Sequence, residues 1–238
     1  YSKEGILSTP VNVCSKFIVV FIIFGAFLER TGIADFFIQI ANAFVGGFSG
    51  GPAKVAVVAS AMEGMVSGSS VANTVGSGSV TIPLMKRTGY KPEFAAAAEA
   101  AASTGGQIMP PIMGAAAFLM ADYVQIPYSE IIVKAILPAV LYFAGIFISV
   151  HLEAKKLGLR GLTKEELPEV KPLLKKCYLL TPLILLIYLV GTSTRSIQYA
   201  ASLSIVACIF VTLFSRETRI TPKRLLEALA AGGQGTIT

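Results

Sequence analysis

The chain has 238 residues, of which 54% are hydrophobic and only 14% are charged, and its mean hydropathy is +0.69. Because a soluble domain carries about 25% charged residues, this composition excludes an ordinary soluble fold and predicts an integral helical membrane protein. The formal net charge is +6. The basic residues fall in a few loops, without a basic patch interleaved with aromatic residues, so we expect no binding of nucleic acid.

The cysteine and histidine residues exclude the common metal sites. Cys14, Cys177 and Cys208 lie far apart, in or beside apolar runs, and no pair has metal-ligand spacing, so we interpret them as packing residues. His151 is the single histidine, which excludes a multi-histidine site. The chain starts without Met and ends in "EALAAGGQGTIT", and we therefore expect it to be a piece of a longer protein.

The first two predicted helices differ in character. The run from Val11 to Leu28 is apolar and long enough to cross a bilayer. From Ile33 to Phe48 the apolar residues recur with the i, i+3, i+4, i+7 spacing of a one-sided helix. Such a helix either lies along the membrane interface or packs on neighbouring helices, and the sequence leaves both open.

Two short helices follow a glycine-rich turn at 46–54. We predict them over Ala53–Val66 and Val71–Met85, where each is about 21 Å long at the rise of an α-helix. The hydrocarbon core of a bilayer is about 30 Å thick. We therefore expect a re-entrant hairpin, although two complete crossings would place the flanking loops on the same side.

The remaining chain reads as further apolar helices. Glu93–Asp122 is a long Ala-rich helix interrupted by "STGGQIMPP". The later predicted spans are Ile131–Leu152, Tyr178–Val190 and Ile197–Phe214. The chain thus divides into a first span with the amphipathic helix (1–52), the hairpin (53–89), the broken helix with the next span (90–152), a charged loop (153–176) and two final spans (177–238).

Lysine and arginine predict the orientation. The loop at 86–91, the loop at 153–176 and the tail at 216–224 are basic, whereas 121–130 has no Lys or Arg. The positive-inside rule places the basic segments in the cytoplasm. Lys54 would then lie on the same side as the 86–91 loop, as a re-entrant hairpin requires.

A polar break separates the two hairpin helices, at Ser67-Gly68-Ser69-Ser70. The first helix ends there with free carbonyls beside serine hydroxyls, and such oxygens suit a hard cation such as Na⁺. The second helix begins at Ser69 or Ser70 with free N–H groups, which suit a carboxylate. We expect Ser70 to cap that helix and the amide of Asn73, one turn later, to face the same site.

A second break interrupts the Ala-rich helix. Pro110 and Pro111 remove two helical donors, so the helix should split into Glu93–Thr104 and about Met109–Asp122. One carbonyl end and one N–H end again meet near the membrane centre. The glycine and polar residues at this break are Ser103, Thr104, Gly105, Gly106 and Gln107.

Each break has a simpler interpretation. Small residues such as those in "GSGS" (76–79) allow close helix packing, and a diproline alone kinks a helix. Irregular backbone at membrane depth, however, is tolerated only inside protein or along a wet cavity. Two such breaks together are typical of secondary transporters built from discontinuous helices. Glu63 and Glu99 lie inside apolar segments, and we expect structural hydrogen bonds for both, with an ion path as the alternative.

The stretches "GGPAKVAVVASAMEGMVSGSSVANTVGSGSVTIPLMKRTGY" and "PEFAAAAEAAASTGGQIMPPIMGAAAFLMADY" resemble the large membrane subunit of TRAP (tripartite ATP-independent periplasmic) transporters. The resemblance covers nearly the whole chain and is most specific over Gly50 to Tyr123. It is strongest to the fused-permease branch that works with TAXI-type binding proteins. Ile112 departs from the "PPS" of other branches.

The resemblance implies an all-α, polytopic protein of the inner membrane with a re-entrant helical hairpin and a broken transmembrane helix. It implies Na⁺-coupled import of organic acids by an elevator mechanism, with a soluble periplasmic binding protein and a small membrane subunit, fused or separate, as partners. Na⁺ is then the coupling ion and there is no other cofactor. The chain holds the first of two inverted repeats and the start of the next, so alone it should not transport.

The resemblance also carries residue roles. The hairpin tip and the broken helix would form one Na⁺ site, near Ser67, Ser69, Ser103 and Thr104, and half of the substrate cavity. The alternatives are H⁺ as the coupling ion, another anion or cation symporter, and a non-catalytic membrane scaffold. A membrane enzyme is not expected, because no catalytic motif accompanies Glu63 or Glu99. The solute stays open.

Overall fold

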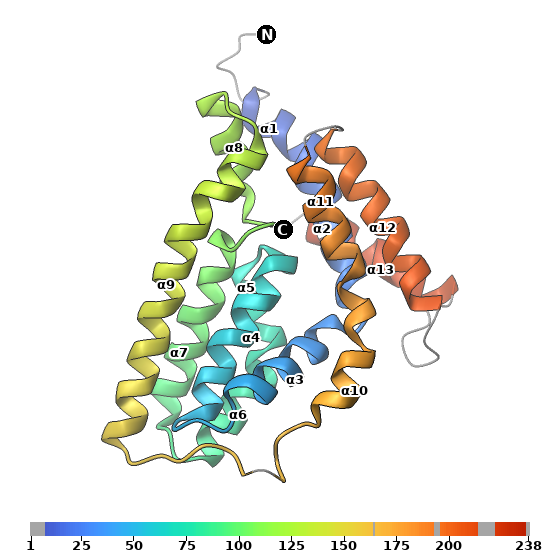
Figure 1. Cartoon of the computed structure of the whole chain (residues 1–238). Helices are drawn as coiled ribbons and strands as arrows, with labels where there is room; N and C mark the ends of the chain where they lie inside the picture. Colours follow the sequence, from blue (N-terminus) through green and yellow to red (C-terminus); the bar gives the residue numbers. More distant parts are fainter. Residues whose placement is uncertain (1–7, 164, 193–195, 214–221, 237–238) are drawn as a thin grey trace. The chain divides into compact units, whose positions relative to one another are not determined.

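The computed structural model describes residues 8–163, 165–192, 196–213 and 222–236, and in these ranges the regular structure is helical throughout (Figure 1). The all-α prediction is confirmed. In chain order the elements are α1 (Thr9–Val13), the π-helical turn Cys14–Ile18, α2 (Val19–Glu29), α3 (Ile33–Val45), α4 (Gly51–Ser67), α5 (Ser70–Gly76), α6 (Gly78–Arg87), α7 (Pro92–Gly105), the 3₁₀ turn Gly106–Ile108, α8 (Ala115–Val124), α9 (Tyr128–Lys156), α10 (Val170–Lys175), the 3₁₀ turn Cys177–Leu180, α11 (Thr181–Gly191), α12 (Ile197–Leu213) and α13 (Pro222–Gly235).

The chain forms two compact units. Unit 1 combines residues 1–33, 114–134 and 177–238, and unit 2 combines 34–113 with 135–176. Each unit therefore joins segments that lie far apart in the sequence. The division of the chain into five consecutive segments, made from the sequence, remains a prediction.

Two helices in the described ranges are long and apolar enough to cross a membrane. They are the continuous run Thr9–Glu29 and α9, Tyr128–Lys156. Helices α11 and α12 lie where the two final spans were predicted: a helical run covers Cys177–Gly191, with a 3₁₀ turn ahead of α11, and α12 covers Ile197–Leu213. Phe214, the predicted end of the last span, lies outside the described residues.

Unit 1 packs α2 against α12 and α13. The rings of Phe21, Phe118 and Tyr128 form an aromatic cluster, with centroids 5.0 Å apart for Phe21–Phe118 and 4.5 Å for Phe118–Tyr128. Arg30 and Glu227 form an ion pair at 3.3 Å. Helix α13 was not predicted, because the sequence from 222 onward was interpreted only as leading into further chain.

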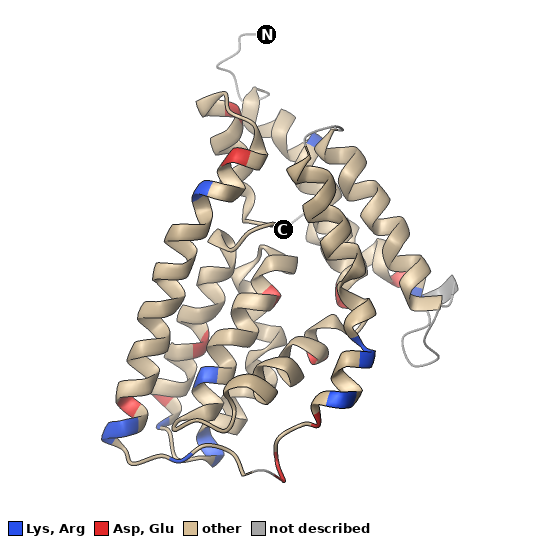
Figure 2. Cartoon of the chain, in the orientation of Figure 1, with Lys and Arg blue, Asp and Glu red and all other residues tan. Residues whose placement is uncertain are grey.

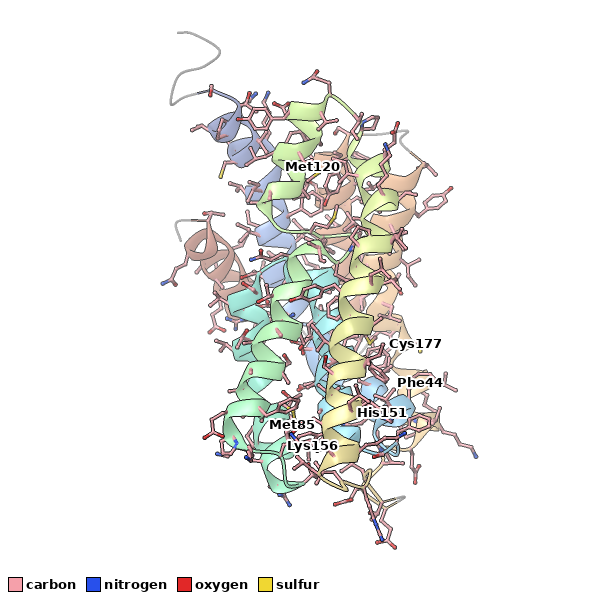
Figure 3. All side chains as sticks on the ribbon, turned by 90° about the vertical axis from the view of Figure 1, so that its left-hand side faces the viewer. Phe44, Met85, Met120, His151, Lys156 and Cys177 are labelled. Carbon is pink, nitrogen blue, oxygen red and sulfur yellow. The ribbon has the colours of Figure 1, made fainter. Side chains whose placement is uncertain are left out.

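Unit 2 places α7 beside the hairpin helices α4, α5 and α6 and beside α9 (Figure 1). Alanines make this close packing possible: Ala95, Ala98 and Ala102 of α7 are buried in one cluster with residues of α4, α6 and α9. Met85 of α6 is part of the same cluster and lies toward the end of α9 that carries His151 and Lys156 (Figure 3). The smooth alanine face thus brings the hairpin and the broken helix into one body.

Helix α3 packs on the hairpin. Ile38 and Ala41 of α3 form a buried cluster with Val55 and Ala59 of α4, so packing on a neighbouring helix is the alternative that the structure supports. The predicted apolar stripe is only partly covered, since Phe44 is 74% exposed (Figure 3).

The charged loop after α9 contacts the turn between α3 and α4. The Leu162 N–H donates to the Gly46 carbonyl at 2.9 Å, and the side chain of Leu167 packs on Gly46. The short helix α10 in this loop was not predicted. Lys and Arg gather where α6 and α9 end (Figure 2), as the basic-loop pattern predicted.

Candidate ion and substrate site

The hairpin reverses at Gly68. Helix α4 ends at Ser67 and α5 begins at Ser70, with Gly68 between them in the left-handed region at φ 58°. Only glycine adopts this φ at little cost, so the sequence dictates the turn here. Ser69, rather than the predicted Ser70, caps α5: its Oγ accepts a hydrogen bond from the Ala72 N–H at 3.3 Å.

The second break is longer than predicted. Helix α7 ends at Gly105, a 3₁₀ turn covers 106–108, and the next helix starts only at Ala115, not near Met109. The Pro110–Pro111 peptide bond is cis. Two prolines offer no N–H and disfavour helical backbone at the residue before each, so the helix cannot restart until they are passed.

The two breaks touch within unit 2. A Cβ on Gly64 would lie 2.4 Å from the Gly106 Cα, and one on Gly68 would lie 2.9 Å from the Met113 carbonyl oxygen. Glycine is therefore required at both points of close approach. Gln107 Nε2 donates to Ser70 Oγ at 3.1 Å, which joins the second break to the hairpin tip by a side-chain hydrogen bond.

Asn73 lies beside this contact and carries an unpaired oxygen. Its side chain is 1% exposed, and its Nδ2 donates to the Ser60 carbonyl at 2.9 Å. A Cβ on Gly106 would lie 3.0 Å from that Nδ2. The Asn73 Oδ1 has no hydrogen-bond partner among the described residues. Because a buried polar atom without a partner costs about 1–3 kcal/mol, it marks a point where a bound group would restore pairing.

The predicted Na⁺ site is not assembled by hydrogen bonds between its two halves: in the described ranges neither Ser67 nor Ser69 is hydrogen-bonded to Ser103 or Thr104. Ser67 Oγ and the Ser69 backbone pair with each other at the hairpin tip. Ser103 is fully buried and donates to Glu99, and the exposed Thr104 donates to the Ala100 carbonyl of its own helix. Both α7 hydroxyls thus already have acceptors, because serine and threonine inside a helix readily bond to groups one turn back.

Glu99 is the centre of a second polar cluster, which we call the Glu99 cluster. Its carboxylate accepts four hydroxyl hydrogen bonds at 2.5–3.1 Å. The donors, all fully buried, are Ser60, Ser77, Thr81 and Ser103. The predicted structural hydrogen bond of Glu99 is confirmed.

The first three of those partners were missed by the sequence analysis. A signal was present in the helical spacing: Ser77 and Thr81 are four residues apart, as are Glu99 and Ser103, so each pair shares one helix face. Glu63 is also buried, and a Cβ on Gly76 would lie 3.4 Å from its Oε2. In the described ranges no three His, Cys, Asp or Glu side chains gather into a metal-binding group.

The model of one protein family, the tripartite ATP-independent periplasmic transporter DctM component, matches residues 5–238. The chain belongs to this family. DctM components are multi-pass proteins of the inner membrane and transporters rather than enzymes, so the predictions of the TRAP family, of the membrane location and of a non-enzymatic protein are confirmed. The TAXI-type branch and the fused architecture remain predictions.

Curated relatives fall in the same family. The chain is 30% identical, over 87% of its own length and 49% of the relative's, to the C4-dicarboxylate TRAP transporter large permease protein DctM of Pseudomonas aeruginosa. It is 32% identical to the Vibrio cholerae protein of the same name, over 65% of this chain and 33% of the relative. It is 26% identical to the sialic acid TRAP transporter large permease protein SiaM of Vibrio cholerae, over 70% of this chain and 39% of the relative. This DctM chain therefore spans about half the length of the curated relatives or less.

Proposed function

We propose that this chain is part of a permease that takes up organic acids together with Na⁺, by an elevator-type mechanism. A periplasmic binding protein would deliver the solute and a small membrane subunit would complete the complex. The printed names of the relatives, which include C4-dicarboxylate and sialic acid permeases, support a carboxylate as the solute.

The observation that carries the Na⁺ proposal is the unpaired Asn73 Oδ1 at the contact of the two breaks. Na⁺ prefers oxygen ligands, and the buried amide of Asn73, whose Nδ2 lies close to Gly106 of the second break, offers one. The orientation of the amide is determined by chemistry, since Nδ2 must face the Ser60 carbonyl and Oδ1 must then face away from it. A bound cation would pair this oxygen.

The elevator proposal draws support from the composition of unit 2. The hairpin helices and α7 belong to one compact unit, and glycine and alanine contacts hold them together. A body that moves through a membrane with its ligand needs both breaks to travel together. The solute carboxylate would bind at the N–H groups that begin α5, next to Ser69 and Ser70.

Uptake by the complete permease in proteoliposomes tests the proposal. The permease, its small subunit and its binding protein are reconstituted, and uptake of a C4-dicarboxylate and of sialic acid is measured with and without an inward Na⁺ gradient. We expect uptake of at least one acid to require the Na⁺ gradient. Uptake that follows an imposed pH gradient instead would replace Na⁺ by H⁺.

The Asn73→Ala variant tests the site. We expect it to raise the half-saturating Na⁺ concentration about tenfold or more. The reason is that the interaction of a polar group with a charged partner is worth roughly 1.5–3 kcal/mol. Ser79→Ala, which removes an exposed hydroxyl from the same hairpin, is the matched control. Equal Na⁺ titrations for Asn73→Ala and wild type would remove Asn73 from the site.

A further inference from the structure

We infer that Glu99 is a positioning residue for the proposed cation site: through Ser60, which bonds to the Asn73 side chain, and Ser77, which contacts the Asn73 backbone, it holds Asn73 in the orientation that presents Oδ1. The inference rests on the proposed function. It deepens that function, because it explains how the hairpin holds one amide oxygen in place.

The Glu99 cluster joins three parts of unit 2. Glu99 Oε1 accepts from Ser60 of α4, from Ser77 between α5 and α6, and from Ser103 of α7, while Oε2 accepts from Thr81 of α6. Both arms of the hairpin and the first half of the broken helix therefore converge on a single carboxylate.

Geometry and hydrogen-bond chemistry suit a carboxylate at this position. A Cβ on Gly78 would lie 3.1 Å from the Glu99 Cγ, so glycine lets α6 approach α7 closely. A carboxylate has about four acceptor sites, and each of the four hydroxyls has one hydrogen to donate. Burial of a carboxylate is costly without such partners, and here both oxygens are paired.

The cluster reaches Asn73 by two routes. Ser60 donates its hydroxyl to Glu99 and accepts from Asn73 Nδ2 with its carbonyl. The Ser77 hydroxyl lies 2.8 Å from the backbone carbonyl oxygen of Asn73 and also contacts Glu99. The two residues that hold Asn73 are thus the ones that Glu99 holds. Without the carboxylate, both hydroxyls lose their shared acceptor. The 3.2 Å contact between them remains, but the link that ties both arms of the hairpin to α7 through Glu99 is lost.

Variants of Glu99 in the complete permease test this inference. We expect Glu99→Ala to raise the half-saturating Na⁺ concentration about tenfold, with less than about a threefold change in the maximal rate per folded transporter. Glu99→Gln keeps one oxygen for the three donors at Oε1, so we expect a rise of only about threefold. Glu93, an exposed acid on the same helix, supplies the control variants Glu93→Ala and Glu93→Gln.

A second readout separates this inference from the proposed function. Amide hydrogen exchange in residues 70–76 of the complete permease should be about tenfold faster in Glu99→Ala than in wild type, and unchanged in Glu93→Ala. If wild-type uptake does not depend on Na⁺, the proposed function fails. Amide exchange in α5 that is the same in Glu99→Ala and wild type would then also overturn the role of Glu99. If wild-type uptake requires Na⁺ but Glu99→Ala leaves the half-saturating concentration unchanged, only the role of Glu99 is overturned. A lower yield of folded protein with wild-type Na⁺ affinity also overturns it, since that is a merely structural effect.

Discussion

Unit 2 contains two polar regions that lie close together yet differ in how their atoms are paired. Around Glu99, four hydroxyls and a carboxylate are fully buried and each has a partner. At the hairpin tip, Asn73 is equally buried, but its Oδ1 has no partner in the described residues. A saturated polar cluster stabilises a particular packing, whereas an unsaturated one leaves room for a ligand.

The surroundings of the two regions differ in the same sense. The Glu99 cluster is enclosed by α4, α6 and α7, and none of its side chains is exposed. At the tip, Ser69 and Ser70 are partly exposed and Gln107 is exposed. A solute and an ion could therefore reach the tip, while the Glu99 cluster serves as its support.

The largest effect is expected from a side chain between the two breaks. In Gly64→Ala the new Cβ would overlap the Gly106 backbone, so the contact must open. Overpacking costs about 1–3 kcal/mol, and we expect Na⁺-dependent uptake to fall about tenfold to a hundredfold. Gly145→Ala is the control, because a Cβ there meets nothing within 4 Å. Wild-type uptake in Gly64→Ala would mean that close contact of the breaks is not needed.

A substitution of Thr81, which lies on neither route from Glu99 to Asn73, should alter stability rather than ion binding. Thr81→Val keeps the shape of the side chain but leaves Glu99 Oε2 without its donor, at a cost of about 1–3 kcal/mol. Thermal unfolding of the purified permease in detergent measures this loss. The half-saturating Na⁺ concentration should change less than about twofold. If ion affinity changes and stability does not, the contrast between the two regions is wrong.

Loss of the helix cap at the tip should have a smaller effect. Ser69→Ala removes the acceptor of the Ala72 N–H, which typically costs about 1 kcal/mol. We expect Na⁺ dependence to weaken about threefold to tenfold, together with faster exchange of the Ala72 amide. Ser70→Ala, which loses the contact with Gln107 instead, should weaken Na⁺ dependence without that change in exchange. Unchanged Na⁺ titrations in both variants would favour mere packing.

The smallest effect concerns the loop after α9, far from both polar regions in sequence. The Thr163 N–H and hydroxyl donate to Glu166, and these hydrogen bonds lower the pKa of its carboxyl below 4.5. A lowered pKa means that the loop contact is fully present above about 4.5 and is lost as the pH falls through the folded-state pKa. The amide signal of ¹⁵N-labelled Thr163 should shift with a midpoint below 4.5 in wild type and in Glu165→Gln, but not in Glu166→Gln. A midpoint at or above 4.5 would contradict the contact.

Local chemistry made both breaks predictable. Gly68 and the Pro110–Pro111 pair interrupt a helix through their own backbone preferences, and the structure has α4 end at Ser67 and α7 at Gly105. The same kind of reasoning erred where several residues compete for one role. Either Ser69 or Ser70 could cap α5, and the choice depends on the turn geometry at Gly68.

Side-chain partners were harder to predict. The resemblance to TRAP transporters places Ser103 and Thr104 near the Na⁺ site, and both are polar and adjacent to the break. In the structure Ser103 donates to the Glu99 side chain and Thr104 donates to the Ala100 backbone carbonyl, both within α7. The four-residue spacing places Glu99 and Ser103 on one helix face, but only packing shows that this face of α7 is the inner one. The helix restarts at Ala115 rather than near Met109, and the sequence likewise did not show over how many residues the two prolines prevent helical backbone.

The sequence by itself determined that the chain is helical and apolar enough for a membrane, and it determined where glycine and proline interrupt the helices, because these properties belong to single residues and their immediate neighbours. The tertiary structure alone decided which polar atoms are paired. Ser60, Ser77 and Thr81 meet Glu99 only because α4, α6 and α7 pack together, and the same packing leaves Asn73 Oδ1 without a partner among the described residues. A hydrogen bond between distant segments depends on distance and direction in space, and neither is written in the order of the residues.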